Sequence, residues 1–381
     1  MKLIHLGDLH FGKSVNEFSM IEDQRFILQE ILNIMEDKEV DTVLIAGDVF
    51  DRSVPSEEAV RLFDEFLTDL VKRKKLVFII SGNHDSDERL NFGSRLFRNE
   101  KVYISGKYTG KVDVETVKDE YGPINVYLMP YVKASAVAHY FPEEKITNYD
   151  SAFKVAIEKC KVNTDERNII LTHQFVTGKS IDTELSGSES SILNVGNVDK
   201  IYSDCFAPFD YVAMGHIHSA QAVGRETVRY AGSPLKYSLS EREIRQTKTV
   251  PVVTLKEKGK VEVELVPLKP LREMRHLRGK LSELLENATD RDDYIYATLT
   301  DEESQYDAMA RIQEVYPHTM KLDYDNKSTR ALQEEDGESK NEDRSFHELM
   351  SDFYKMIKGG EPSEEEWKLL EEVAKEAGVM E

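Results

Sequence analysis

The sequence predicts an α/β fold with a layered core, followed by a small α+β domain and a pair of C-terminal helices. Three observations support this prediction. Short β-branched runs alternate with amphipathic stretches through the first half of the chain. The pattern changes after Pro270, and a polar, charged segment precedes the last amphipathic stretches. At roughly 150 residues per domain, a chain of 381 residues is expected to form two or three domains.

The first half contains strand-like runs separated by helical ones. Lys2–Leu6 predicts a strand, and Gln24–Met35 predicts a helix because its apolar residues recur every three or four positions. Thr42–Ala46 predicts a second strand, and Pro55 introduces a helix that ends near Lys72. Further strands are expected at Leu76–Ile80, Asn125–Met129, Asn168–Thr172 and Tyr211–Met214.

The second half predicts a hairpin and then a separate small domain. Alternating runs between Val250 and Pro267 flank a turn-like segment and indicate the hairpin. Beyond Pro270 we expect a helix over RHLRGKLSELLENA, a strand at YIYATLT, a helix opened by the capping box Thr300-x-x-Glu303, and a strand at MKLDY. The predicted organisation is a domain over 1–270, a small domain over 271–325, a linker over 326–345 and a helix pair over 346–381.

The helix pair predicts a docking element. Its first apolar stripe ends at Gly359-Gly360, and Ser363-x-x-Glu366 forms a capping box for the second helix. Two short helices beyond a linker bury their apolar stripes poorly by themselves, so we expect them to dock on a partner. Folding back on their own chain is the alternative. A Ser/Gly-rich stretch between 177 and 197 predicts a surface loop.

The composition limits the classes of function. A net charge of -21 argues against broad electrostatic capture of nucleic acid, although bound divalent cations let an acidic protein hold phosphate. No apolar run approaches the roughly 20 residues of a membrane span, and the N-terminus lacks the apolar core of a secretory signal, so a cytoplasmic protein is expected. Cys160 and Cys205 are the only cysteines and form no C-x-x-C pair, which indicates neither a disulfide framework nor a thiolate zinc site.

The segment GDLHFGKS at residues 7–14 supports two interpretations. It satisfies G-x-x-x-x-G-K-[ST], the pattern of a phosphate-cradling nucleotide loop that would end in Lys13 and Ser14. It also contains Asp8-x-His10, a pair of metal ligands after an apolar run. An Asp within a nucleotide loop would repel phosphate, and no apolar helical stripe follows directly. The metal interpretation is therefore preferred.

Other residues with metal-binding or acid–base chemistry also follow predicted strands. Each motif is weak alone, since a single histidine is more often a hydrogen-bonded core residue. Together they lie at strand carboxyl ends, where loops of α/β proteins converge. Imidazole with carboxylate suits first-row divalent metals such as manganese, zinc or iron, and the set exceeds one ion's needs, which indicates a binuclear phosphoesterase site. The candidates are Asp8, His10, Asp48, Asn83, His84, Asp85, His173, His216 and His218.

The ordered motifs GDLH, GDVFD, GNHD, ILTHQ and GHIH resemble the calcineurin-like metallophosphoesterase superfamily, in particular its double-strand-break repair branch of SbcD-type nuclease subunits. The resemblance runs from Met1 to about Ser240 and includes YAGSP at 230–234; the small domain and the helix pair match in layout only. It implies a β-sandwich flanked by helices, with the small domain as a capping, DNA-binding domain.

The resemblance also implies roles for the site residues. His84 would stabilise or protonate the leaving oxygen, with Asp85 holding its imidazole. Arg52 resembles the phosphate-gripping arginine of protein phosphatases, with a surface salt bridge as the alternative, and some repair relatives have a histidine where Asp51 stands. Two ions, most simply Mn²⁺, would be held by Asp8, His10 and His218 and by Asn83, His173 and His216, with Asp48 bridging.

The function implied by the resemblance is a DNA nuclease for double-stranded ends and for single-stranded or hairpin DNA. The family implies an SbcC-like coiled-coil ATPase that binds residues 346–381, and a homodimer that yields a heterotetramer with that ATPase. A partner would also explain an acidic nuclease, because it supplies phosphate contacts. A phosphatase or cyclic-nucleotide phosphodiesterase is the alternative within the same fold, and an inactive DNA-end scaffold is the non-enzymatic alternative.

Overall fold

The computed structural model describes residues 1–178, 183, 200–303 and 305–327, together with scattered positions between 350 and 370. Its contacts divide the chain into two units. The first comprises Met1–Thr298 with Tyr306–Asp323, and the second comprises Leu299–Gln305 with Tyr324–Glu381. In the described part of the chain, no helix is both long and apolar enough to cross a membrane.

The first large sheet has the strand order β16-β15-β1-β4-β5-β6. Its four strands from the first third of the chain are parallel to one another, whereas the hairpin β15–β16 joins antiparallel to β1. The parallel strands are buried β-branched or aliphatic runs, as expected for a sheet covered on both faces. The strands are β1 (Lys2–Leu6), β4 (Thr42–Ala46), β5 (Leu76–Ile80), β6 (Val102–Ser105), β15 (Thr249–Leu255) and β16 (Val261–Pro267).

The second large sheet has the order β13-β14-β12-β9-β8-β7. Its central strands are parallel, and an antiparallel strand closes each edge. The strands are β7 (Asp113–Asp119), β8 (Gly122–Met129), β9 (Arg167–His173), β12 (Tyr211–Gly215), β13 (Gln221–Val223) and β14 (Arg225–Tyr230).

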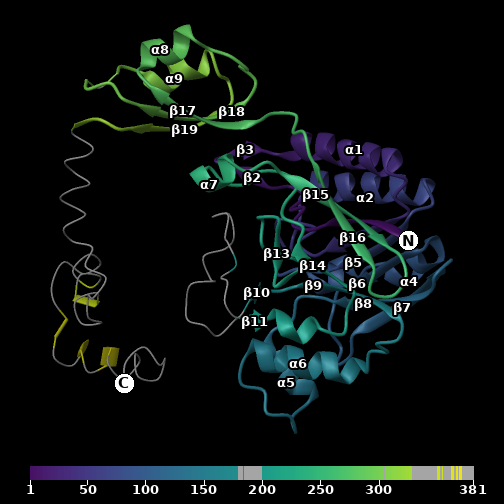
Figure 1. Cartoon of the computed structure of the whole chain (residues 1–381). Coiled ribbons are helices and arrows are strands. Elements are labelled where there is room, and N and C mark those ends of the chain that lie inside the picture. Colours follow the sequence, from purple (N-terminus) through teal and green to yellow (C-terminus); the bar gives the residue numbers. More distant parts are fainter. Residues whose placement is uncertain are drawn as a thin grey trace. The chain divides into compact units, whose positions relative to one another are not determined.

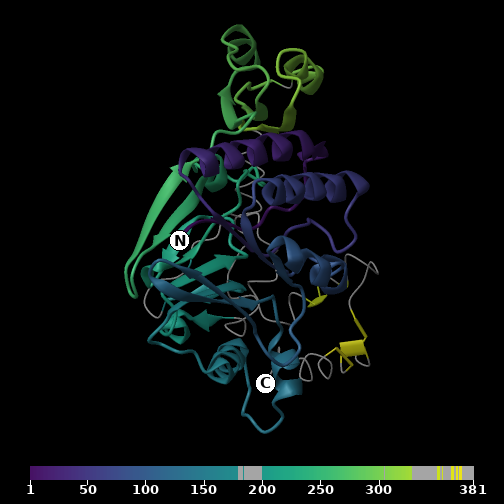
Figure 2. The same cartoon turned by 90° about the vertical axis from the view of Figure 1, so that its right-hand side faces the viewer.

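The two sheets pack face to face as a sandwich with helices outside, which confirms the predicted fold class. One buried apolar cluster combines side chains of both sheets, including Leu44 and Phe78 of the first and Ile169 and Leu171 of the second. On the outer face of the first sheet lie α1 (Ile21–Asp37) and α2 (Glu57–Lys72), and α5 (Ala134–Tyr140) and α6 (Tyr149–Cys160) lie beside the second sheet (Figures 1 and 2). The Ser56 hydroxyl caps α2 by accepting the Ala59 N–H.

Shorter elements connect the sandwich. The helical ones are α3 (Asp87–Leu90), α4 (Ser94–Phe97), α7 (Glu241–Ile244) and 3-10 turns at Arg98–Glu100 and Ser203–Phe206. The extended ones form two small ladders, β2 (Ser14–Val15) with β3 (Phe18–Ser19) and β10 (Val176–Thr177) with β11 (Ile201–Tyr202). The free thiols Cys160 and Cys205 are partly buried against the apolar cluster around α6.

The predicted small domain contains a three-stranded sheet of β17 (Met274–Gly279), β18 (Tyr294–Leu299) and β19 (Thr319–Tyr324) with helices α8 (Leu281–Glu286) and α9 (Ala308–Gln313).

Two predictions in this region were wrong. Residues 275–279, expected to be helical, belong to β17: His276 Nε2 lies 2.8 Å from Thr298 Oγ1, and its ring stacks on Tyr296 at a centroid separation of 4.3 Å. Cross-strand partners thus prevail over the local helical pattern. Thr300 does not open α9, which begins after Asp307, where Ala308 and Ile312 are the residues it buries.

The described positions near the C-terminus include the predicted capping box. The Ser363 N–H donates to Glu366 Oε2 at 2.9 Å, and the Glu366 N–H donates to Ser363 Oγ at 3.3 Å. This reciprocal pair is the geometry of a helix N-terminus and confirms the local prediction. Most of the linker over 326–345, most of the helix pair over 346–381 and most of the Ser/Gly-rich loop lie outside the described residues.

Candidate metal centre

The predicted ligands gather at the carboxyl ends of strands from both large sheets. Asp8 and His10 follow β1, Asp48 follows β4, and His173 ends β9. Asp8, His10, Asp48, His173 and His218 are each at most 3% exposed, whereas Asn83, His84 and His216 are partly accessible. The centre is thus buried on most sides and opens where Asn83 and His84 lie.

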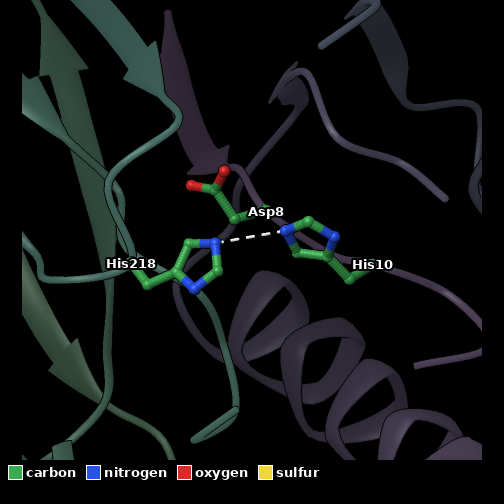
Figure 3. Close-up of side chains that lie close together, drawn as sticks. All are labelled: Asp8, His10 and His218. Atoms are coloured by element: carbon green, nitrogen blue, oxygen red, sulfur yellow. Dashed lines mark hydrogen bonds between the residues drawn. The ribbon is translucent and has the colours of Figure 1, made fainter. Parts of the chain in front are cut away.

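Asp8, His10 and His218 form the first group of donors. Nε2 of His10 lies 3.1 Å from Nε2 of His218, and one ligand atom of each residue lies within 4.8 Å of the others. Figure 3 shows the two imidazole rings turned toward each other with the Asp8 side chain beside them. Two imidazoles and a carboxylate that converge in this way form a typical half-site for a divalent ion.

Asn83, His173 and His216 form the second group. The Asn83 Oδ1 atom lies 3.1 Å from Nε2 of His173 and 2.9 Å from Nδ1 of His216. Nδ1 of His173 donates to the Ala46 carbonyl oxygen at 2.8 Å, which fixes the tautomer and leaves its Nε2 directed at Asn83.

Asp48 lies between the two groups. Its Oδ2 atom is 3.3 Å from Nε2 of His173 and 3.6 Å from Nε2 of His10. Its Oδ1 atom accepts the His84 N–H at 2.9 Å, so the orientation of the carboxylate is determined. One carboxylate therefore contacts an imidazole of each group, the arrangement that a shared ligand requires.

The backbone at these residues is strained. Asp8, His10, Asp48 and His216 have φ values of 53°, 45°, 49° and 97°, in the left-handed region that non-glycine residues rarely adopt. Such strain concentrates at functional sites, where the surrounding structure holds it in place. The left-handed backbone conformation turns these side chains toward the centre shortly after their strands end.

Gly82 makes the close approach of these loops possible. An ideal Cβ at Gly82 would lie only 2.1 Å from Asp48 Oδ1 and 2.4 Å from the Asp48 nitrogen. A side chain at this position would displace the Asp48 carboxylate that both groups contact. Steric constraint therefore requires a glycine at this position of GNHD.

Burial keeps three of the imidazoles neutral. It lowers the pKa of His10 and of His216 to about 3, and lowers the pKa of His218 well below its usual value. Neutral imidazoles offer the lone pairs that metal coordination needs. Burial also acts to lower the pKa of His173, but the adjacent Asp48 carboxylate outweighs this effect and the pKa of His173 rises to about 9.

The donor set fits divalent metal ions. Each group combines imidazole nitrogen with oxygen, which suits first-row metals better than magnesium or calcium. The buried carboxylates of Asp8 and Asp48 supply negative charge that bound cations would offset. The residues thus provide a candidate binuclear centre for divalent ions.

The structure gives His84 a different partner from the one expected. Nδ1 of His84 donates to the backbone carbonyl of Asp51 at 2.9 Å. The Asp85 carboxylate instead accepts the backbone N–H groups of Gly82, Val49 and Phe50 at 2.9, 3.1 and 2.9 Å. Asp85 therefore joins the GDVFD and GNHD loops rather than orienting the imidazole. Main-chain donors prevail because a buried N–H must find an acceptor.

Residues 13, 14 and 52 lie at the edge of the centre. Lys13 Nζ binds Asp51 Oδ1 at 2.7 Å, and Ser14 begins the short strand β2 rather than a helix, which excludes a nucleotide loop. Arg52 is 82% exposed, and its Nε lies 3.7 Å from Asp51 Oδ2. In this conformation Arg52 therefore forms a surface ion pair with Asp51.

Lys248 supports the centre but carries no signal in the sequence. Its Nζ donates to the His218 carbonyl at 3.0 Å, to Ser233 Oγ at 3.0 Å and to Glu243 Oε1 at 3.1 Å. Both Lys248 and Glu243 are buried, so the ion pair fixes the loop that carries His218. The local sequence around Lys248 does not predict these contacts, because its partners come from three separate segments of the chain.

Comparison with known proteins adds independent information. Residues 1–220 match the model of the calcineurin-like phosphoesterase family, and residues 270–357 match a model described as the type 5 capsule protein repressor C-terminal domain. A curated relative from Staphylococcus epidermidis, named as the SbcD component of the nuclease SbcCD, is 32% identical over 331 residues, which cover 84% of this chain and 85% of the relative.

Similar solved structures include a Thermus thermophilus protein and a dimetal phosphatase from Danio rerio. The first aligns with a TM-score of 0.40 at 10% identity over 69% of this chain and 98% of that chain. The second aligns with a TM-score of 0.41 at 10% identity over 72% of this chain and 99% of that chain.

Proposed function

Because the chain belongs to the calcineurin-like phosphoesterase family and to its SbcD nuclease subunits, we propose that it is a metal-dependent DNA nuclease acting in DNA repair and recombination. Its substrates are double-stranded ends and single-stranded or hairpin DNA, and the reaction is hydrolysis of a phosphodiester bond. The observation that carries the proposal is the position of Asp48 between two groups of imidazole and oxygen donors.

We infer two divalent ions, with Mn²⁺ as the ion that the family resemblance favours. Asp8, His10 and His218 would hold one ion, Asn83, His173 and His216 would hold the other, and Asp48 would be the ligand shared by both; the distances within each group support this assignment. Bound divalent ions polarise the phosphate and lower the pKa of water.

His84 acts on the leaving oxygen in this proposal. Its Nδ1 donates to the Asp51 carbonyl, so Nε2 is the nitrogen that remains for substrate. The side chain is partly accessible, unlike most of the proposed ligands, as contact with a leaving group requires. His84 would donate a proton from Nε2 to the departing oxygen or hydrogen-bond to it.

The proposed organisation places the nuclease domain at 1–270, the capping, DNA-binding domain at 271–325, a linker at 326–345 and the partner-binding helices at 346–381. The name of the Staphylococcus epidermidis relative describes one component of SbcCD, and this supports an SbcC-like coiled-coil ATPase as the partner. A homodimer would then yield a heterotetramer, located in the cytoplasm at the nucleoid.

One experiment tests this function. The full chain, with and without an SbcC-like partner and ATP, is assayed in Mn²⁺ on end-labelled duplex, hairpin DNA, cyclic nucleotides and phosphopeptides. A nuclease cleaves the DNA and leaves the small substrates largely intact. Hydrolysis of cyclic nucleotides or phosphopeptides without DNA cleavage would instead identify the phosphodiesterase or phosphatase alternative.

A further inference from the structure

A groove of about 520 Å³ lies beside the metal centre and is unused by the roles assigned above. Gly82, Asn83 and Asp85 line one part of it, and Tyr131, Lys133 and Tyr140 are among the residues that line the rest. We propose that this groove binds the unpaired nucleotide next to the scissile phosphate, with its base stacked on Tyr131 and its outer phosphate near Lys133. The inference rests on the proposed nuclease function and names how its substrate is held.

Tyr131 has a fixed place next to the centre. Its N–H donates to the Ser81 carbonyl at 2.9 Å, and Gln174 Nε2 donates to the Val132 carbonyl at 2.8 Å. These bonds tie the loop after β8 to the loop after β5, which carries Asn83, and to Gln174, which directly follows His173 at the end of β9. The Tyr131 ring meets the His173 ring edge-on at a centroid distance of 6.4 Å. An aromatic face is therefore held beside a proposed metal ligand.

Tyr140 provides a second aromatic surface, which packs against neighbouring residues and is also exposed to solvent. Its ring contacts Tyr108 edge-on at 5.8 Å, and an ideal Cβ at Gly110 would lie 2.6 Å from its Cδ1 atom. The ring thus packs against the Gly110 backbone, yet Tyr140 remains 42% exposed. A large aromatic side chain in such a position offers a stacking surface at low entropic cost.

The charges of the groove nearly balance, so aromatic contact is the main attraction. Lys107 is neutralised by Glu88 at 2.6 Å, and Asp87 also lines the groove. Lys133 is exposed and makes no ion pair with any described residue, which leaves it available for one phosphate. His139 adds a further polar edge. One cation with aromatic faces matches a single nucleotide better than a long polyanion.

The chemistry favours an unpaired nucleotide. Every base has a π-face, and proteins that hold single strands combine stacking aromatics with cations near the backbone. A base within a duplex is already stacked on its neighbours and cannot also lie on Tyr131, so the strand must be opened at this point. A groove of this volume falls in the range of small-ligand sites.

The test compares Tyr131→Leu with Tyr131→Phe in the full chain. Substrates are an oligothymidylate and bis(p-nitrophenyl) phosphate, which has no base, and binding of labelled oligothymidylate to metal-free protein is followed by anisotropy. Stacking predicts a roughly tenfold rise in KM and in Kd for the oligonucleotide with Tyr131→Leu, and less than about twofold with Tyr131→Phe. A change in the metal centre would alter the KM values of both substrates, so the ratio of the KM for oligothymidylate to that for bis(p-nitrophenyl) phosphate isolates the effect of base stacking.

A second pair of variants tests the contact between Lys133 and the outer phosphate. Both substitutions are at exposed lysines, where misfolding is not expected. Lys133→Gln is expected to raise the oligonucleotide Kd about threefold, while Lys111→Gln, at an exposed lysine outside the groove, leaves it unchanged. Equal effects of Tyr131→Leu on both substrates, or no effect on the oligonucleotide, would overturn the inference while the nuclease function stands. Wild-type protein that hydrolyses bis(p-nitrophenyl) phosphate but neither binds nor cuts the oligonucleotide would overturn both.

Discussion

Oδ2 of Asp48 lies 3.3 Å from Nε2 of His173, although Asp48 follows β4 and His173 ends β9, and these strands belong to different sheets. Burial acts to raise the pKa of Asp48, but His173 opposes it and the pKa lies well below its usual value. A single carboxylate thus joins the two halves of the sandwich at the point where both groups of donors meet. Assembly of the centre depends on the packing of one sheet on the other.

Asp48→Asn should abolish tight metal binding, because the shared negative ligand is lost. Removal of a residue that only hydrogen-bonds to a metal ligand lowers metal affinity by about 10- to 100-fold. Removal of the shared ligand itself should therefore lower the affinity by at least about 100-fold. Calorimetric titration with Mn²⁺ measures the effect, with Asp64→Asn on the exposed face of α2 as the matched control. Wild-type affinity in Asp48→Asn would remove the bridging assignment.

His84→Ala should separate chemistry from metal binding. Removal of a general acid lowers kcat by about 10²- to 10⁴-fold, whereas the donors of both groups stay in place. Metal content by elemental analysis and kcat on DNA give the two readouts. If cleavage were unaltered, His84 would have no part in the reaction.

Gly215→Ala should destabilise the fold. An ideal Cβ at Gly215 would lie 2.1 Å from the Ala46 carbonyl oxygen, which also accepts the His173 Nδ1–H. The Ala46 backbone cannot yield cheaply, so we expect a loss of about 3 kcal/mol in the free energy of unfolding measured in urea. Gly279→Ala is the control, because its Cβ would meet only side-chain atoms, the nearest being Leu284 at 3.3 Å. Equal stability of the two variants would contradict this steric argument.

Asp119 should make stability depend on acid pH. The Arg167 guanidinium holds the pKa of Asp119 below its usual value against a smaller opposing effect of burial, and the N-terminal ammonium lowers this pKa further by a lesser amount. A lowered pKa contributes stability that is present above pH ~4 and lost as pH falls through the folded-state value. Asp119→Asn should therefore cost about 3 kcal/mol at pH 7, because it leaves the buried Arg167 without its carboxylate partner.

Urea unfolding from pH 7 to pH 2 measures this dependence. The difference between wild type and Asp119→Asn should narrow below pH ~4, since the protonated carboxyl resembles the amide. A constant difference at all pH values would show that the ion pair is not its source. Asp64→Asn, on exposed surface, should stay within about 0.5 kcal/mol of wild type throughout.

Local pattern was sufficient for much of the fold. Buried β-branched runs predict β1, β4 and β5 with the bounds that the structure has, and Pro55 with the apolar spacing locates α2. The same reasoning failed at β17, whose residues could also form a helical stripe. Only pairing with β18 decides between the two, because cross-strand bonds come from residues distant in sequence.

The sequence by itself determined the α/β alternation and the residue types after each strand, because periodicity and strand-end chemistry are local. The tertiary structure alone decided that Asp48 contacts both His10 and His173, and that Asp85 binds backbone N–H groups instead of His84. It also decided that Lys248 supports His218. These relationships depend on positive φ values, glycine contacts and the packing of two sheets, and no local pattern encodes distances between segments that far apart.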